Sequence, residues 1–294
     1  IDAMGLPNAM FPEVAAPATT LGPLKPDFAA ETGLANLNVV ASLSHDTACA
    51  VAACPAEGER WAYISSGTWS LMGLEIPEPI ITDACRELNF TNEIGYGGSI
   101  RLLKNIIGLW LVQECRRAWA SQGNEYSYAD LAEQAGAAEP YVSVLNPSDP
   151  RFLAPDDMPQ RIADTCRESG QPIPGTPGAV VRCALESLSL LYARTLCESE
   201  ELVGWRANTV HIVGGGSRNE LLNQLTADAA NIRVVAGPTE ATASGNVLVQ
   251  AITAGAVTDL DEARQIVRSS FDTKIFEPKP SEAIEAARAR FDQL

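Results

Sequence analysis

The chain has 294 residues, of which 46% are hydrophobic and 20% charged, and it holds no apolar run of about eighteen residues. This composition predicts a soluble, globular protein rather than a disordered or membrane-spanning one. The length is typical of about two domains. The formal net charge of −16 and the pI near 4.5 argue against a nucleic-acid surface, which needs a basic stripe. A phosphate-bearing ligand would then be held by backbone N–H groups, hydroxyls and a divalent cation rather than by a field of lysines.

Seven cysteines without any C-x-x-C pair are typical of a cytoplasmic protein with reduced, buried thiols. Cys166 and Cys183 flank a Pro/Gly-rich loop at 171–178, so they could face each other. Because a Cα separation cannot be read from sequence, a disulfide between them stays open. The first residues lack the basic start and apolar centre of a secretory signal, and Ile1 is not an initiator methionine, so we expect the chain to begin partway through a longer protein.

In chain order, residues 1–36 are irregular apart from a short helix at 26–32, which Gly33 ends. The apolar run 37–41 predicts a strand, and the alanine-rich run 48–53 predicts a helix. Asp46 stands at this junction, where ligands gather in α/β proteins and a carboxylate can accept a proton or a hydrogen bond. Aspartate is also a favoured capping residue, so a purely structural role for Asp46 stays open.

Two extended runs, 61–64 and 69–74, enclose a tight turn at 65–68 that either presents hydroxyls and N–H groups to a phosphate or is only a hairpin turn. From Ser99 to Cys115 the apolar residues recur at intervals of three and four, which predicts one helix. Asn105 and Gln113 would then share one face of it, either lining a cleft or facing solvent.

A compact α/β unit follows: strand 210–213, glycine loop 214–216, helix 217–230 and strand 232–235. His211, within the apolar strand, is predicted to be a core histidine with its hydrogen bonds satisfied. The pair Ser244-Gly245 interrupts a helix predicted at 240–254, which indicates close approach by another backbone. Further helices are predicted at 127–137, 156–168, 179–203, 259–269 and 281–293.

The glycine loop suits an anion or a nucleotide, because residues without side chains let a ligand lie against the backbone. It is not a dinucleotide fingerprint, since Asn219 stands where the third glycine should be, and the absence of any Gly-Lys pair excludes a Walker A loop. A structural strand-to-helix turn stays open as the alternative. Neither a zinc-binding spacing nor the Gly-x-Ser-x-Gly elbow of many hydrolases occurs.

Taken together, several blocks in this order resemble the FGGY carbohydrate kinases over about residues 39–267. The blocks are Ser44-His45-Asp46-Thr47-Ala48, the stretch from Tyr63 to Gly73, the stretch from Leu103 to Leu111, the stretch from His211 to Asn219, and Ala236-Gly237-Pro238-Thr239-Glu240-Ala241. The resemblance implies an α/β, actin-like ATPase (ribonuclease H-like) fold, as the second domain of a two-domain sugar kinase. It implies ATP and Mg²⁺ as cofactors and a ketose as the small-molecule substrate.

By this resemblance Asp46 takes the position of the catalytic base, which accepts the proton of the ketose 1-hydroxyl as that hydroxyl attacks the γ-phosphate. The residues implied in contact with the sugar are His45, Thr47 and Asn105. Those implied on the ATP side are Thr68, Gln113, Gly215 and Gly216. L-rhamnulose is the expected acceptor; L-fuculose, L-xylulose and a non-catalytic actin-like nucleotide-binding module stay open as alternatives.

The resemblance also divides the chain. Residues 1–44 would be the tail end of the first, sugar-binding domain, 45–262 the nucleotide-binding domain, and 263–294 a pair of C-terminal helices. The family's first phosphate loop, an Asp-x-Gly-x-Ser/Thr hairpin near its N-terminus, is missing from this sequence. We therefore expect the fragment alone to have little or no kinase activity, with the missing N-terminal domain of the same polypeptide as its partner.

Overall fold

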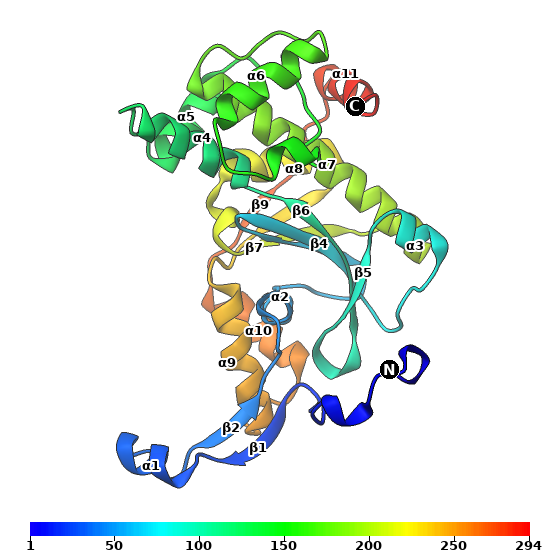
Figure 1. Cartoon of the computed structure of the whole chain (residues 1–294), viewed down its shortest axis with the longest axis vertical. Coiled ribbons are helices and arrows are strands. Elements are labelled where there is room, and N and C mark those ends of the chain that lie inside the picture. Colours follow the sequence, from blue (N-terminus) through cyan, green and yellow to red (C-terminus); the bar gives the residue numbers. More distant parts are fainter.

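The computed structural model describes all residues 1–294, and a seven-stranded sheet at its centre confirms the predicted α/β class (Figure 1). The strand order is β5-β6-β4-β3-β7-β8-β9. β7 is parallel to both β3 and β8, and all other neighbouring pairs are antiparallel. The strands are β3 (Trp61–Ser66), β4 (Trp69–Ile76), β5 (Thr91–Ile94), β6 (Ile100–Ile107), β7 (Thr209–Val213), β8 (Arg233–Ala236) and β9 (Lys274–Phe276).

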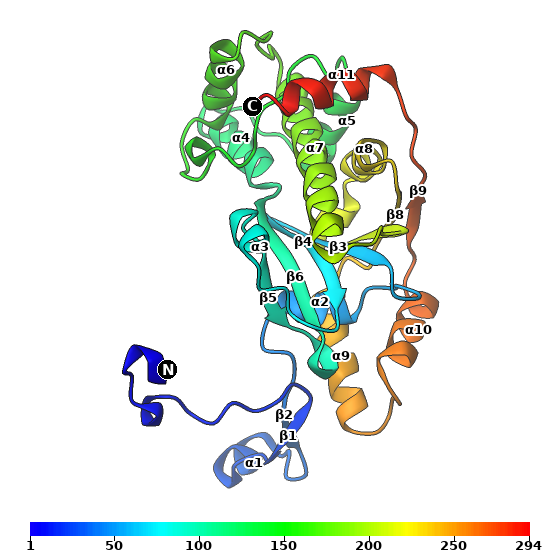
Figure 2. The ribbon, with the colours of Figure 1, turned by 90° about the vertical axis from the view of Figure 1, so that its right-hand side faces the viewer.

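Helices cover both faces of this sheet (Figure 2). The side chains of a strand alternate between the two faces, so Ile64 packs into the larger apolar core while its neighbour Tyr63 packs into a smaller one. The larger core lies under α4 (Trp110–Ser121), α5 (Tyr128–Ala137), α6 (Met158–Glu168), α7 (Pro177–Val203), α8 (Glu220–Ala230) and α11 (Glu282–Phe291). The opposite layer consists of α2 (Asp46–Ala52), α9 (Ala241–Thr253) and α10 (Leu260–Ser270), while α3 (Asp83–Glu87) lies beside β5.

The N-terminal segment lies outside the central sheet and its two helix layers, and it meets them at the end of α9, where Thr253 Oγ1 donates to Ala18 O at 3.3 Å (Figure 1). It contains 3-10 turns at Asp2–Met4 and Asn8–Met10, then β1 (Thr19–Pro23), α1 (Pro26–Thr32) and β2 (Asn38–Ala41). The predicted helix 26–32 is confirmed, with Gly33 ending it in the left-handed conformation. The strand before Asp46 is confirmed too, but it pairs only with β1 in a separate hairpin and is not part of the central sheet.

The single helix predicted from Ser99 to Cys115 is wrong. Residues 100–107 form strand β6, Gly108 breaks the chain, and α4 begins only at Trp110. β6 lies between β4 and β5, and neighbouring residues such as Leu102 and Leu103 are both buried because they face different helix layers. A strand buried on both faces loses the alternation of apolar and polar residues, so its sequence cannot be told from a buried helix by periodicity.

The remaining helices lie within a few residues of their predicted positions. The helix predicted at 127–137 is α5, and the side chain of Ser127 caps it. Strands β1 and β9 were not foreseen. None of the helices combines the length and apolar content that a crossing of a membrane demands.

Candidate active site

Helix α2 begins at Asp46, and His45 is its capping residue. The backbone N–H of Thr47 donates to His45 Nδ1 at 3.1 Å and to Asp46 Oδ1 at 2.7 Å. His45 Nδ1 lies 2.9 Å from Asp46 Oδ1, and it would donate to this carboxylate only when it carries a proton, in which case it no longer accepts from Thr47 N. Asp46 is the first residue of the helix, and His45 is the cap. The alternative that Asp46 serves only as the capping residue is therefore wrong.

The carboxylate of Asp46 remains available to a ligand. Its side chain is 75% exposed, and Oδ2 has no hydrogen-bond partner in the protein. Thr47, the next residue, is buried, whereas the three residues before it, Ser44, His45 and Asp46, are exposed. The structure therefore presents an open carboxylate at the start of a helix whose remaining residues are locked into the core.

Helices α2 and α9 run side by side, as the predicted close approach at Ser244-Gly245 requires. A Cβ atom on Gly245 would lie 1.8 Å from the carbonyl oxygen of Cys49, so no other residue fits there without a shift of backbone. One turn earlier, Thr242 Oγ1 donates to the carbonyl oxygen of Asp46 at 3.3 Å. The beginning of α9 thus lies beside the beginning of α2.

Thr68 is exposed in the two-residue turn between β3 and β4. This turn is held against the start of α4 by three backbone hydrogen bonds. Gly108 N and Trp110 N donate to Thr68 O, both at 3.1 Å, and Leu109 N donates to Gly67 O at 3.0 Å. Gln113, half-buried in the first turn of α4, is consequently carried by an element anchored to the Thr68 turn.

Asn105 and Gln113 do not share a helix face, because Asn105 belongs to β6 and Gln113 to α4. Asn105 is exposed and lies on the same face of β6 as Leu103, which packs against α2. Across the sheet it aligns with Leu71 of β4, which aligns in turn with Ser65 of β3. Asn105 thus occupies the α2 side of the sheet near the end of β3.

In the glycine loop, close packing rather than a ligand accounts for two of the three glycines. A Cβ on Gly216 would lie 2.0 Å from Ser66 Oγ, and a Cβ on Gly214 would lie 3.0 Å from Ser66 O. Gly214 also has a φ of 84°, which disfavours other residues. Gly215 is different: it is exposed, and a Cβ there would meet nothing within 4 Å. Only Gly215 offers open space to a ligand.

A continuous series of contacts joins Asp46 to the glycine loop and the Thr68 turn. Thr242 contacts Asp46, and three residues earlier Thr239 Oγ1 lies 3.4 Å from Ser217 Oγ. Gly214 N donates to Pro238 O at 3.1 Å, and the loop packs on Ser66, which directly precedes the Thr68 turn. We call this end of the sheet, where parallel β3 and β7 both end, the carboxyl edge.

Thr239 and Thr242 were not singled out from the sequence as site residues, although the block that contains Gly237-Pro238-Thr239 was noted. Helix α8 begins at Glu220 rather than Ser217, because Asn219 provides its cap by accepting from Leu222 N at 3.0 Å. Ser217 is thereby left free to bridge the glycine loop, since its Oγ donates to Gly214 O at 2.7 Å.

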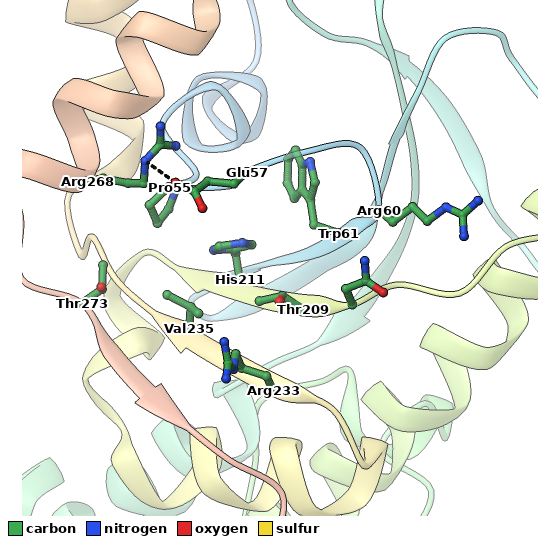
Figure 3. Close-up of a pocket in the computed structure, with 11 residues that line it drawn as sticks. Pro55, Glu57, Arg60, Trp61, Thr209, His211, Arg233, Val235, Arg268 and Thr273 are labelled. Carbon is green, nitrogen blue, oxygen red and sulfur yellow. Dashed lines mark ion pairs between the residues drawn. The ribbon is translucent and has the colours of Figure 1, made fainter.

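His211 lies in the middle of β7, in a cavity of about 380 Å³ (Figure 3). It is buried, as expected, but its Nδ1 has no hydrogen-bond partner, so the expectation that its hydrogen bonds are satisfied is wrong. Burial, with the charges of Arg264 and Arg268 adding to it, lowers the pKa of His211 to about 4. Two arginines that line the cavity are already paired, Arg268 with Glu57 and Arg233 with Glu277. None of the sequence-predicted site residues lines this cavity.

All seven cysteines are free thiols, so the disulfide that the sequence left open between Cys166 and Cys183 does not form here. Both residues are buried, and contact with Cys166 together with burial raises the pKa of Cys183. Nowhere do three or more His, Cys, Asp or Glu side chains converge as metal ligands.

Comparison with known proteins gives a consistent result. A family model described as the FGGY family of carbohydrate kinases, C-terminal domain, matches residues 62–254. The chain is 46% identical over 291 residues to a rhamnulokinase of Bacteroides thetaiotaomicron, covering 99% of this chain and 59% of that protein. It is 44% identical over 279 residues to a rhamnulokinase of Bacillus subtilis, covering 95% and 57%. The chain thus spans a little over half the length of the curated relatives it matches.

Solved structures show the same fold at low sequence identity. A xylulose kinase from Rhodospirillum rubrum superimposes with a TM-score of 0.74 at 17% identity, over 98% of this chain and 57% of the other. A glycerol kinase from Plasmodium falciparum, solved with ADP, gives 0.71 at 15% identity, over 97% and 56%. The expected actin-like ATPase fold is confirmed by these likenesses.

Proposed function

The chain belongs to the FGGY family of carbohydrate kinases, and from this premise we propose that it is the nucleotide-binding part of a kinase that converts L-rhamnulose and ATP into L-rhamnulose 1-phosphate and ADP. The identity of 46% to a rhamnulokinase supports the choice of sugar. The observation that carries the proposal is the series of contacts at the carboxyl edge, which joins Asp46, the Thr68 turn and the glycine loop in one place. Phosphoryl transfer needs this kind of alignment more than it needs covalent help.

On the sugar side, Asp46 would act as the general base. Its exposed carboxylate would accept the proton of the ketose 1-hydroxyl through the unpartnered Oδ2, as the hydroxyl oxygen attacks the γ-phosphorus. His45 would contact the sugar beside it. Thr47 is assigned the same role by resemblance, but because its side chain is buried, its contribution would be chiefly the N–H that fixes Asp46 Oδ1. Asn105 would contact the sugar from β6.

On the nucleotide side, Thr68 would contact the phosphates and Gln113 would add an amide from α4. Gly215, with open space above it, would lie against the adenosine, and Gly216 would contribute its backbone alone. Mg²⁺, when bound with ATP, would supply charge neutralisation for the phosphates. The acidic chain makes that neutralisation necessary, since no lysine cluster serves the purpose.

We further infer that residues 1–44 belong to the preceding, sugar-binding domain and that residues 45–262 form the nucleotide-binding domain. Residues 263–294 would add the C-terminal helices, with the boundary falling inside α10 and with β9 joining the central sheet. Large apolar side chains are more often exposed in residues 1–39 than in all the rest of the chain. Such exposure is expected where a further domain packs. The full active site would then lie between the two domains, and this chain alone would show little or no turnover.

The test is a coupled assay of ADP release with L-rhamnulose, L-fuculose and L-xylulose, run on this chain and on the polypeptide extended by its first domain. We expect turnover only in the extended protein, and with L-rhamnulose preferred. Preference for another ketose would overturn the choice of substrate, and sugar-independent nucleotide binding without any turnover would point to a non-catalytic module. Measurable phosphorylation by this chain alone would contradict the need for the first domain.

A further inference from the structure

Beneath the carboxyl edge lie three buried hydroxyl groups, from Ser66, Ser70 and Tyr192, which we call the hydroxyl cluster. Ser66 and Ser70 face each other across the β3–β4 hairpin and are 2% and 0% exposed. Tyr192 lies near the middle of α7 and is fully buried. Its hydroxyl is 2.5 Å from Ser70 Oγ, in a hydrogen bond in which either group can donate.

The hydroxyl cluster contacts the glycine loop and the residue that leads towards α4. Gly216 packs on Ser66, so that a Cβ there would lie 2.0 Å from Ser66 Oγ. Gly108 packs on Ser70 in the same way, with a Cβ position 2.5 Å from Ser70 Oγ. The glycine loop and the segment that leads into α4 therefore both pack against buried hydroxyl groups of the β3–β4 hairpin, and α7 contacts these groups through Tyr192. Figure 2 shows α7 running along one face of the sheet at β3 and β4.

The tyrosine hydroxyl is not needed to fill space. Apolar residues surround Tyr192 along α7, including Leu188, Leu191 and Leu196, and the larger core packs around its ring. A phenylalanine would fill nearly the same volume, whereas the buried hydroxyl must find a partner to offset its desolvation. Its partner is Ser70, two residues after Thr68, so the bond fixes the hairpin near its turn.

We propose that Tyr192 is a positioning residue for the nucleotide. Through its hydrogen bond to Ser70 it holds the Thr68 turn in the position in which this turn binds the terminal phosphates of ATP. This role rests on the proposed function, because it concerns how the nucleotide site of that function keeps the Thr68 turn in place. Tyr192 touches no substrate. Its effect falls on the phosphate end of the nucleotide, because its hydroxyl bonds Ser70, whereas Ser66 Oγ, on which the glycine loop packs, has no hydrogen-bond partner. The glycine loop has hydrogen bonds of its own, from Gly214 N to Pro238 O and from Ser217 Oγ to Gly214 O.

The experiment compares the dissociation constants of ATP and AMP for this chain by isothermal titration calorimetry, in the variants Tyr192→Phe and Ser70→Ala. We expect each variant to lower the preference for ATP over AMP by roughly five- to tenfold, the effect of losing about one hydrogen bond. AMP affinity should stay at the wild-type level. The double variant should be no weaker than either single one, because both changes remove the same bond.

Tyr63→Phe is the matched control. Tyr63 is also fully buried, but its hydroxyl has no partner and it faces the α2 layer, so removing that hydroxyl should leave the ATP preference unchanged. Should Tyr192→Phe fail to fold, Ser70→Ala tests the same bond from the other side. An unchanged preference in a folded variant would overturn the positioning role alone. Failure of the unmodified chain to bind either nucleotide would instead overturn the proposed function, and the inference with it.

Discussion

Gly245 of α9 lies directly against Cys49 of α2, so that a Cβ on Gly245 would stand only 1.8 Å from the Cys49 carbonyl oxygen. The two helices approach as closely as their backbones allow. Because Thr242 and Asp46 meet one turn away, this contact fixes where the carboxylate of Asp46 lies relative to the glycine loop.

Replacing Gly245 by alanine should therefore destabilise the protein by roughly 1–3 kcal/mol, because the added methyl group meets backbone that cannot rotate aside. Urea unfolding followed by circular dichroism measures the change. Gly136→Ala is the control: Gly136 also lies inside a helix, α5, but a Cβ there meets nothing within 4 Å. That substitution should stabilise the protein by roughly 0.5–1 kcal/mol. Equal effects at both positions would contradict the close contact.

Asp46→Asn in the polypeptide that includes the first domain should lower turnover by about 10²- to 10⁴-fold, because an amide cannot accept the proton of the attacking hydroxyl. Nucleotide affinity should stay nearly unchanged. Asp83→Asn is a matched control, since Asp83 is likewise the first residue of a short helix and its side chain is 86% exposed. Steady-state ADP release and ATP titration give both quantities, and retained turnover in Asp46→Asn would reject the base assignment.

The two neighbouring glycines of the loop should respond differently to alanine. Gly215→Ala should leave stability within about 0.5 kcal/mol of the unmodified protein but weaken ATP binding, because its open space is where we place the adenosine. Gly216→Ala should destabilise the fold, since the methyl group would collide with Ser66. Urea unfolding measures the stability of both variants, and calorimetric titration measures their affinity for ATP. Unweakened binding in Gly215→Ala would remove that residue from the site.

His211 should make stability depend on pH between about 6.5 and 4. Its folded pKa of about 4 is below the usual value of 6.5, so the unfolded chain takes up a proton first as the pH falls. The stabilisation is complete above pH 6.5 and is lost as the pH falls towards 4, to a total of about 3 kcal/mol at most.

The chain has only two histidines, so proton NMR can follow His211 directly, with His45→Gln to assign the signals. In urea unfolding at several pH values, His211→Gln should lose this part of the pH dependence, whereas His45→Gln should retain it. A His211 signal that titrates near pH 6.5 would show that burial does not depress its pKa.

Of the seven cysteines only Cys197 is exposed, so a thiol reagent should label one thiol rapidly in the folded chain and seven after unfolding. Burial raises the pKa of most of the others and shields all of them, which slows their reaction as thiolates. Cys197→Ser should abolish the rapid phase. A count of five thiols after unfolding without reductant would reveal a disulfide, contrary to the structure.

Local sequence signals were sufficient for several parts of the site. Asp46 begins a helix and a strand leads into the glycine loop, as their residues predicted. A hairpin turn joins β3 and β4 where one was predicted, but it is shorter than the predicted 65–68, because Ser65 and Ser66 belong to β3. The serine and glycine within α9 correctly indicated close contact with another backbone. These features depend on residues adjacent in the chain, where turn chemistry and side-chain size act directly.

The tertiary structure alone decided what these parts do together. Residues 100–107 form a strand because they pair with β4 and β5 in the sheet. Helices cover both faces of this strand, so its sequence lacks the alternation of apolar and polar residues that would have identified it. The same long-range packing places Asn105 and Gln113 on different elements. It also packs Gly216 against Ser66, while Gly215 keeps open space above its backbone. The sequence by itself determined the residue types, the local turns and the order of the blocks. Which of them meet at the carboxyl edge was decided by contacts between residues as far apart as Asp46 and Thr242, because only folding brings such residues within hydrogen-bonding distance.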